Sequence, residues 1–348
     1  MRLGPSARRI LDAPRVAPGE AALKPAIDAL GGEVVKLRAR DGHRLGGRWL
    51  PAEAGPLPSG ARDESAGDPG LERWRPDPYE AILLLHGWTG SIVPDLVDLG
   101  PTLRRTAGVL GLDFRGHGTS DDAPSTFGLH EIEDVAGALA WLGERGIRRV
   151  ALAGSSMGGV VAIASIVVLG DGSLTQADDD PASPAAAIDP PRPRIVAAVA
   201  ESVSPDLRIP IANRMPLPLG GPLRRALAGR MFAAASRQVG GDIRATEPGR
   251  IVGLVEPVPL LLIHGAADRT VPPSAGRRLA RLAGPSAEHW EVPGADHGAA
   301  HATDPAEWDL RVSRFLRRAF VESREALPII DSSGAPTPEH AHPGPEGD

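Results

Sequence analysis

One serine, one aspartate and one histidine in this chain could together carry out nucleophilic acyl transfer. Ser156 is the centre of the frame Gly154-x-Ser156-x-Gly158, Asp268 follows the apolar run VPLLLIHG, and His297 lies in VPGADHG. A serine hydroxyl is a poor nucleophile, so it needs a histidine as general base and a carboxylate to orient that histidine. We therefore interpret Ser156, Asp268 and His297 as a candidate catalytic triad.

The context of Ser156 carries more information than the frame itself. With 42 glycines in 348 residues, a G-x-S-x-G frame arises easily by chance. Here the strand-like run RRVALAG precedes the serine and the helix-like run GGVVAIASIVVLG follows it. A sharp turn between a strand and a helix is the setting that exposes a nucleophilic serine, whereas the alternative is that Ser156 is an ordinary helix N-cap.

Other residues could replace the proposed base and acid. His301 is a second histidine close to His297 in sequence, although we expect it inside the helix that follows. Glu201 and Asp206 come near the end of the apolar run IVAAVAE and are the acids most able to substitute for Asp268.

Acyl transfer also needs hydrogen-bond donors for the negative charge that develops on the carbonyl oxygen. The stretch LLLHGWTGS leads from an apolar run into a loop, and we expect the backbone N–H groups of Trp88 and Met157 to form this oxyanion hole. His86 in that stretch and His117 in DFRGHGTSD are interpreted as structural residues that hold their loops by hydrogen bonds.

The elements that must position these residues are short apolar runs separated by helical stretches. Near-continuous apolar runs are typical of parallel strands that are buried on both faces. Such runs, predicted to be strands, cover 81–85, 108–113, 148–154, 195–201 and 258–265, and the helical spacing of apolar residues predicts a helix over 129–144. Residues 34–37 and 45–50 flank Asp41-Gly42, a hairpin turn signal. The pattern predicts an α/β fold with a mostly parallel, doubly wound sheet that an antiparallel hairpin opens.

We expect residues 1–330 to form a single domain. Residues 52–78 and 171–193 are rich in Pro, Asp, Ser and Ala and are interpreted as loop insertions, and 331–348 as a disordered tail. Between the sixth and seventh strands, residues 206–257 begin with apolar residues broken by prolines and continue in a helix-like run. This segment is interpreted as a short helical lid or cap, and ordinary packing of a crossover is the alternative.

Composition excludes several classes of function. The chain has no cysteine, so disulfides, thiolate metal sites and a cysteine nucleophile are excluded. Its net charge is −6 and its basic residues are scattered pairs without interleaved aromatics, so nucleic acid is not an expected partner. Because no apolar run reaches the length of a membrane span, we expect a cytoplasmic protein. No cofactor and no metal are expected, although His340 and His342 lie together in the tail, and the oligomeric state is not predicted.

Taken together, the motifs HGWTG, DFRGHGTSD, GSSMGG, HGAADRTVP and GADHG resemble those of the α/β-hydrolase superfamily of serine hydrolases. The resemblance runs from about residue 33 to 320 and is strongest with a bacterial branch that includes esterases, thioesterases, lipases and peptidases. It implies an α/β-hydrolase fold, with Ser156 as nucleophile, Asp268 as acid, His297 as base, and Trp88 and Met157 at the oxyanion positions. The oxyanion loop departs from the HGGG of some lipases and esterases.

The function that we expect is hydrolysis of a small carboxylic ester through an acyl-serine intermediate. Use of the same triad by a peptidase or thioesterase is the first alternative. A non-catalytic ligand-binding protein on the same fold is the second, although a binding protein has no physical need for all three triad residues. A small-molecule ester or related acyl compound is the expected partner, with an apolar acyl or alcohol group.

Overall fold

The computed structural model describes residues 10–16, 19–58, 74–170 and 192–326. The predicted tail, with His340 and His342, lies outside the described residues, as do most of 171–193 and the middle of 52–78.

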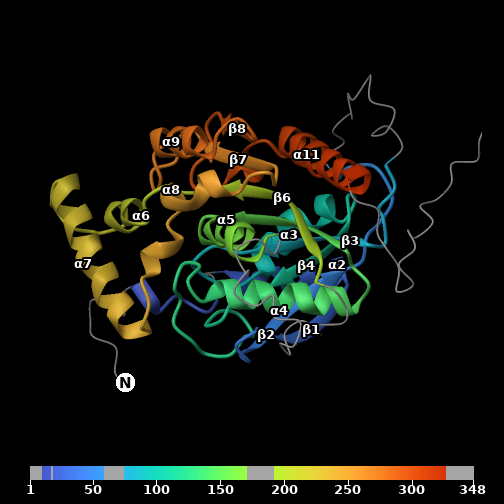
Figure 1. The fold of residues 1–348 in the computed structure, drawn as a ribbon, viewed down its shortest axis with the longest axis horizontal. Helices are drawn as coiled ribbons and strands as arrows, with labels where there is room; N and C mark the ends of the chain where they lie inside the picture. The colour runs from blue at the N-terminus through green and yellow to red at the C-terminus, as the bar shows by residue number, and fades with distance from the viewer. Residues whose placement is uncertain (1–9, 17–18, 59–73, 171–191, 327–348) are drawn as a thin grey trace, which may run out of the picture.

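A central sheet carries the candidate site residues (Figure 1). In the described part of the chain it has eight strands in the order β1-β2-β4-β3-β5-β6-β7-β8. They are β1 (Glu33–Arg38), β2 (Arg44–Leu50), β3 (Glu80–Leu85), β4 (Gly108–Leu112), β5 (Arg149–Ser155), β6 (Arg194–Glu201), β7 (Leu260–Gly265) and β8 (Ala287–Val292). Strand β2 runs antiparallel to β1 and β4, and all other neighbours are parallel. The predicted fold class, a mostly parallel sheet opened by an antiparallel hairpin, is confirmed.

Helices cover both faces of this sheet (Figure 1). They are η1 (Glu20–Leu23), α2 (Lys24–Leu30), α3 (Val93–Leu103), α4 (Glu131–Glu144), α5 (Met157–Leu169), α6 (Arg208–Asn213), α7 (Gly221–Val239), η3 (Ile243–Thr246), α8 (Pro248–Ile251), η4 (Val252–Leu254), α9 (Pro273–Ala283), α10 (Ala300–Thr303) and α11 (Pro305–Ala326). None of the helices in these ranges combines the length and apolar composition that a bilayer span requires.

The two faces of the sheet have separate apolar cores. In β3, Leu83 and Leu85 pack with α4 and α5, whereas Ile82 and Leu84 pack with α3 and α11. Successive side chains of a strand point to opposite faces, so an all-apolar strand must be covered on both sides. All six residues of β3 are buried, which explains why its sequence has no polar alternation.

The segment 206–257 forms α6, α7, η3, α8 and η4. The helix-like run predicted after the prolines corresponds to α7. Helix α7 lies at one end of the molecule, outside α6 (Figure 1), and its buried residues Met231 and Phe232 join the core that contains α4 and α5.

Candidate active site

A strained turn exposes the candidate nucleophile. Ser156 stands between the end of β5 and the start of α5 with φ 53° and ψ −112°, a conformation that costs about 1–3 kcal/mol in a residue with a side chain. The neighbouring glycines make this turn possible. A Cβ at Gly154 would lie 2.6 Å from the Gly158 carbonyl carbon, and one at Gly158 would lie 2.1 Å from the Leu85 oxygen.

The structure brings together Ser156, His297 and Asp268, which come from distant parts of the chain. The Ser156 Oγ lies 3.0 Å from His297 Nε2, and His297 Nδ1 lies 2.8 Å from Asp268 Oδ2. As N-cap of α5, Ser156 makes no side-chain capping bond, so its hydroxyl is directed to the imidazole instead. The arrangement can transfer a proton from the hydroxyl to Nε2 while Nδ1–H donates to the carboxylate.

The carboxylate of Asp268 is fixed by the loop that carries it. The backbone N–H groups of Thr270 and Val271 donate to Asp268 Oδ1 over 2.8 and 2.7 Å, which leaves Oδ2 for the histidine. Asp268 is 4% exposed, so these donors replace the water that a charged carboxylate needs. Its position directly after β7 explains why the acid reaches the carboxyl end of the sheet.

The rival base, His301, lies elsewhere in the same loop region. It lies in α10, as expected, and its Nδ1 is 2.9 Å from Asp98 and its Nε2 3.3 Å from Asp309. Burial alone would lower the pKa of His301, but the carboxylates of Asp309 and Asp98 outweigh it and raise that pKa to about 9. A histidine that keeps its proton at neutral pH is a poor general base.

The rival acids make other contacts. Asp206 forms an ion pair of 2.6 Å with Arg208. Glu201 is buried at the end of β6, and its Oε1 accepts a bond of 3.0 Å from the Ala300 N–H. Burial raises the pKa of Glu201 to about 7, although the bond from Ala300 opposes that rise.

The end of β6 also holds the loop that carries the histidine. Besides the bond from Ala300 to Glu201, the Gly298 N–H donates to the Ser202 hydroxyl over 3.0 Å. Both bonds hold the backbone just C-terminal to His297. Sequence reasoning considered Glu201 only as a rival acid and missed Ser202, because a serine at the end of a strand carries no signal of its own.

Two histidines orient the loop that contains Trp88. His86 Nε2 accepts a bond of 3.1 Å from the Phe114 N–H, so Nδ1 carries the ring proton and donates to the Gly87 carbonyl over 2.6 Å. Burial, with a smaller effect from the neighbouring His117, lowers the pKa of His86 to about 3, so the ring is neutral. In a trans peptide the C=O and N–H point in opposite directions, so the Trp88 N–H points away from His86.

The N–H groups of Trp88 and Met157 are both free to bind an anion. Within the described residues neither donates to a protein acceptor. Gly87 lies against Ser156, since a Cβ built on Gly87 would be 3.8 Å from Ser156 Cβ. The Trp88 carbonyl faces His117 Nε2 at 2.8 Å, so His117 also holds this loop.

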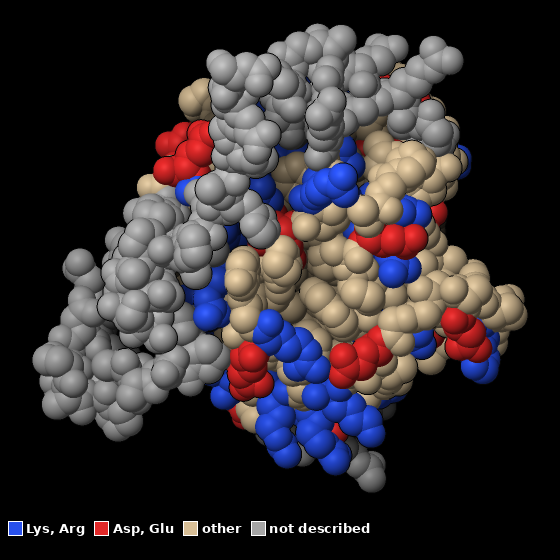
Figure 2. Space-filling model, turned by 90° about the vertical axis from the view of Figure 1, so that its right-hand side faces the viewer, with Lys and Arg blue, Asp and Glu red and all other residues tan. Residues whose placement is uncertain are grey.

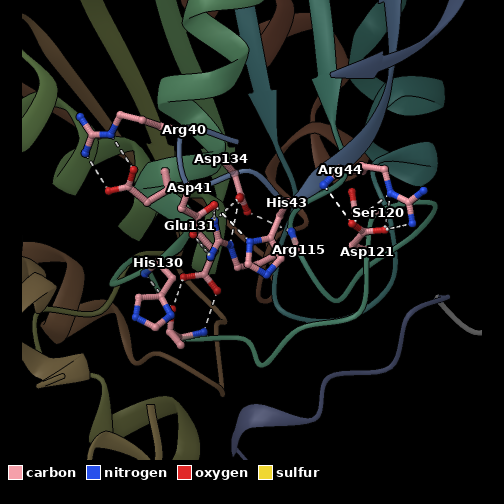
Figure 3. A network of polar contacts seen from close by, with 12 residues as sticks. Arg40, Asp41, His43, Arg44, Arg115, Ser120, Asp121, His130, Glu131 and Asp134 are labelled. Carbon is pink, nitrogen blue, oxygen red and sulfur yellow. Dashed lines mark hydrogen bonds and ion pairs between the residues drawn. The ribbon is translucent and has the colours of Figure 1, made fainter. Parts of the chain in front are cut away.

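An ionic network around the buried Arg115 supports the loop that carries His117 (Figure 3). Arg115 donates to Asp134 over 2.9 Å and to Asp41 over 2.8 Å. Burial raises the pKa of Asp134 to about 7 even though Arg115 opposes it. Burial would also raise the pKa of Asp41, but the bonds from Arg115 dominate and lower it to about 2. The sequence did not predict this network.

Apolar rings lie beside the candidate nucleophile loop. Trp88 stacks on Phe127 with ring centroids 5.9 Å apart, and Phe127 meets Phe232 of α7 edge-on at 5.8 Å. This arrangement suits an apolar group better than a charged one. Among the described residues, no group of three or more His, Asp or Glu side chains could hold a metal ion.

Three comparisons relate this chain to known proteins. A model of the Alpha/beta hydrolase family matches residues 82–308. The uncharacterized protein YfhR of Escherichia coli (strain K12) is 26% identical over 259 residues, which are 74% of this chain and 70% of that protein. YfhR of Salmonella typhi is 25% identical over 269 residues, 76% of this chain and 74% of that protein.

Solved structures share the fold at low identity. The Pyrococcus furiosus esterase Pf2001 matches with a TM-score of 0.59 and 22% identity, covering 89% of this chain and 98% of that one. The alpha/beta hydrolase GrgF from Penicillium sp. sh18 matches with a TM-score of 0.54 and 18% identity, covering 84% of this chain and 100% of that one.

Proposed function

This chain belongs to the alpha/beta hydrolase family, and from that membership we propose that it is a serine hydrolase that cleaves small carboxylic esters through an acyl-serine intermediate. The observation that carries the proposal is the continuous path from Ser156 Oγ through His297 to Asp268, at 3.0 and 2.8 Å. Peptidase or thioesterase use of the same residues is the competing activity.

In the first half-reaction Ser156 Oγ attacks the ester carbonyl carbon and its proton passes to His297 Nε2. Asp268 stabilises the imidazolium through the Nδ1–H bond. The carbonyl oxygen becomes an oxyanion, which the N–H groups of Trp88 and Met157 stabilise. When the tetrahedral intermediate collapses, the C–O bond to the alcohol breaks and Nε2 returns its proton to the leaving oxygen.

In the second half-reaction water attacks the acyl-serine and gives a proton to His297 Nε2. The oxyanion forms again at the same two N–H groups. Collapse breaks the bond between the acyl carbon and Ser156 Oγ, and Nε2 reprotonates the serine. The proposed reaction therefore uses the three side chains, the two backbone N–H groups and one water molecule.

We also propose that 1–330 is one catalytic domain and that 206–257 is its lid. The edge-on contact between Phe232 of α7 and Phe127 supports this, because it joins the segment to the rings beside the nucleophile loop. The same apolar rings favour an ester with an apolar acyl or alcohol group.

A panel of substrates tests the activity. We expect turnover of p-nitrophenyl esters, compared from acetate to decanoate, to exceed that of aminoacyl p-nitroanilides and acyl thioesters. A Ser156→Ala chain, checked for its fold by circular dichroism, should be inactive on all of them. Faster turnover of the anilides or thioesters would replace the ester proposal, and no turnover of any member would favour a binding protein.

A further inference from the structure

One segment of the chain is strongly basic although the whole chain is acidic. Residues 207–241 contain six arginines and no Asp or Glu, in a chain whose net charge is −6. The arginines are Arg208, Arg214, Arg224, Arg225, Arg230 and Arg237. Arg208 pairs with Asp206, and none of the others lies within ion-pair distance of a carboxylate in the described residues.

The same segment exposes large apolar side chains. Leu217, Leu219 and Leu223 are 38%, 36% and 56% exposed, and they follow one another across the loop into the first turn of α7. Prolines and glycines separate them in the sequence. An exposed leucine is ordinary by itself, but three in seven residues form an apolar tip.

Helix α7 presents one face to the molecule and the opposite face to solvent. Its inward face packs Ala228, Met231, Phe232 and Ala235 into the structure. The outward stripe follows the spacing of three and four residues that places side chains on one side of a helix. It consists of Leu223, Ala226, Arg230, Ala233 and Arg237, all of them exposed.

The position of α7 leaves its outward stripe accessible to a partner. Helix α7 forms one end of the molecule (Figure 1), so nothing in the described structure lies outside it. Figure 2 views the molecule from the opposite end, where Lys and Arg are interspersed with Asp and Glu. Residues 207–241 therefore combine arginines with exposed leucines and contain no acid of their own.

We propose that this surface, defined as Leu217, Leu219, Leu223, Arg230 and Arg237, docks the protein on an anionic lipid bilayer. The arginines would contact the anionic headgroups and the leucines would enter the interfacial region, as in helices that lie in the plane of a membrane. A bilayer fits this surface better than a second copy of the chain would, because two copies placed face to face would bring arginines against arginines. The leucines select it over nucleic acid, which offers no apolar phase.

Vesicle sedimentation tests the proposal independently of the proposed activity. The full chain and its Ser156→Ala form are mixed with vesicles of phosphatidylcholine alone or with 30 mol% phosphatidylglycerol as probe. Binding to the anionic vesicles is expected, equal for both chains, and weakened by salt because it depends on charge. The same chain at equal concentration is run by light-scattering chromatography to follow self-association.

Two matched variants locate the surface. Leu223→Ser/Arg230→Gln/Arg237→Gln removes one exposed aliphatic side chain and two cations from α7, and should lower partitioning at least about tenfold, since each arginine near an anionic surface is worth about fivefold. Val34→Ser/Lys36→Gln/Arg38→Gln also removes one aliphatic side chain and two cations, here from exposed positions of β1, and should partition like the parent chain. Equal binding by the two variants, equal binding to neutral and anionic vesicles, absence of binding, or self-association through α7 instead would each overturn the proposal.

Discussion

His297 contacts both of its partners through the two nitrogens of one ring, so a change in either neighbour acts on the same imidazole. Asp268 Oδ2 accepts from Nδ1 at 2.8 Å, and Ser156 Oγ lies 3.0 Å from Nε2. Residues that act as a unit in this way have effects that do not add.

We therefore expect Asp268→Asn and His297→Ala each to lower kcat by about 10³ to 10⁴ with little change in KM, because the lost interaction belongs to the transition state. The double variant should be hardly slower than His297→Ala alone. Asp206→Asn makes the same chemical change at the rival acid that pairs with Arg208, and its kcat should stay near that of the parent. A near-normal kcat for Asp268→Asn would transfer the role of the acid to Glu201 or Asp206.

His301 should make stability depend on pH. Although burial opposes it, the carboxylates of Asp309 and Asp98 raise its pKa in the folded protein to about 9, above the ordinary value of about 6.5. A histidine whose pKa is higher in the folded than in the unfolded protein stabilises the fold. This stabilisation is complete at pH values below the pKa of the unfolded state, and it is lost as the pH rises through about 9.

Compared with the parent, His301→Gln should lower the free energy of unfolding by an amount on the order of 2 kcal/mol at pH 6. Most of that difference should vanish by pH 10. Urea unfolding of both chains at several pH values measures it. A difference that is constant with pH would mean that the ring acts only through packing, for example on Trp308.

At the scale of elements, the turn between β5 and α5 sets the position of Ser156, the proposed nucleophile. We expect Gly158→Ala to lower kcat at least about a hundredfold, since a Cβ 2.1 Å from the Leu85 oxygen must displace the turn by a large part of an ångström. Gly229→Ala in α7 is the control, because its Cβ would lie 3.6 Å from the nearest atom and alanine favours a helix. Steady-state kinetics with an ester substrate and thermal unfolding compare the two variants. Full activity in Gly158→Ala would contradict the account of the turn.

At the scale of the whole molecule, the central parallel strands were predictable because each is a mostly apolar run that is buried on both faces. The run AILLL corresponds to β3, in which every residue is buried, and the Asp41-Gly42 signal lies in the turn between β1 and β2. The proximity of Ser156 and His297, which are 141 residues apart, was predicted from their motifs and their places after strands. Their catalytic roles stay predictions.

Other parts of the fold carry no local signal. The order of strands places β4 between β2 and β3, which no property of β4 alone indicates. Arg115 reaches Asp41 across 74 residues, and the N-terminal Ile10 is fully buried in the main core. Such contacts depend on how separate segments pack, so reading one segment at a time could not find them.

Labelling with a fluorophosphonate, followed by mass spectrometry of the modified peptide, tests whether Ser156 is the nucleophile. We expect one adduct per chain, located on Ser156, present in Ser155→Ala and absent from a folded Ser156→Ala chain. Labelling should be far slower in His297→Ala, because the hydroxyl then has no base. An adduct on Ser155, or one that persists in folded Ser156→Ala, would show that Ser156 is not the nucleophile.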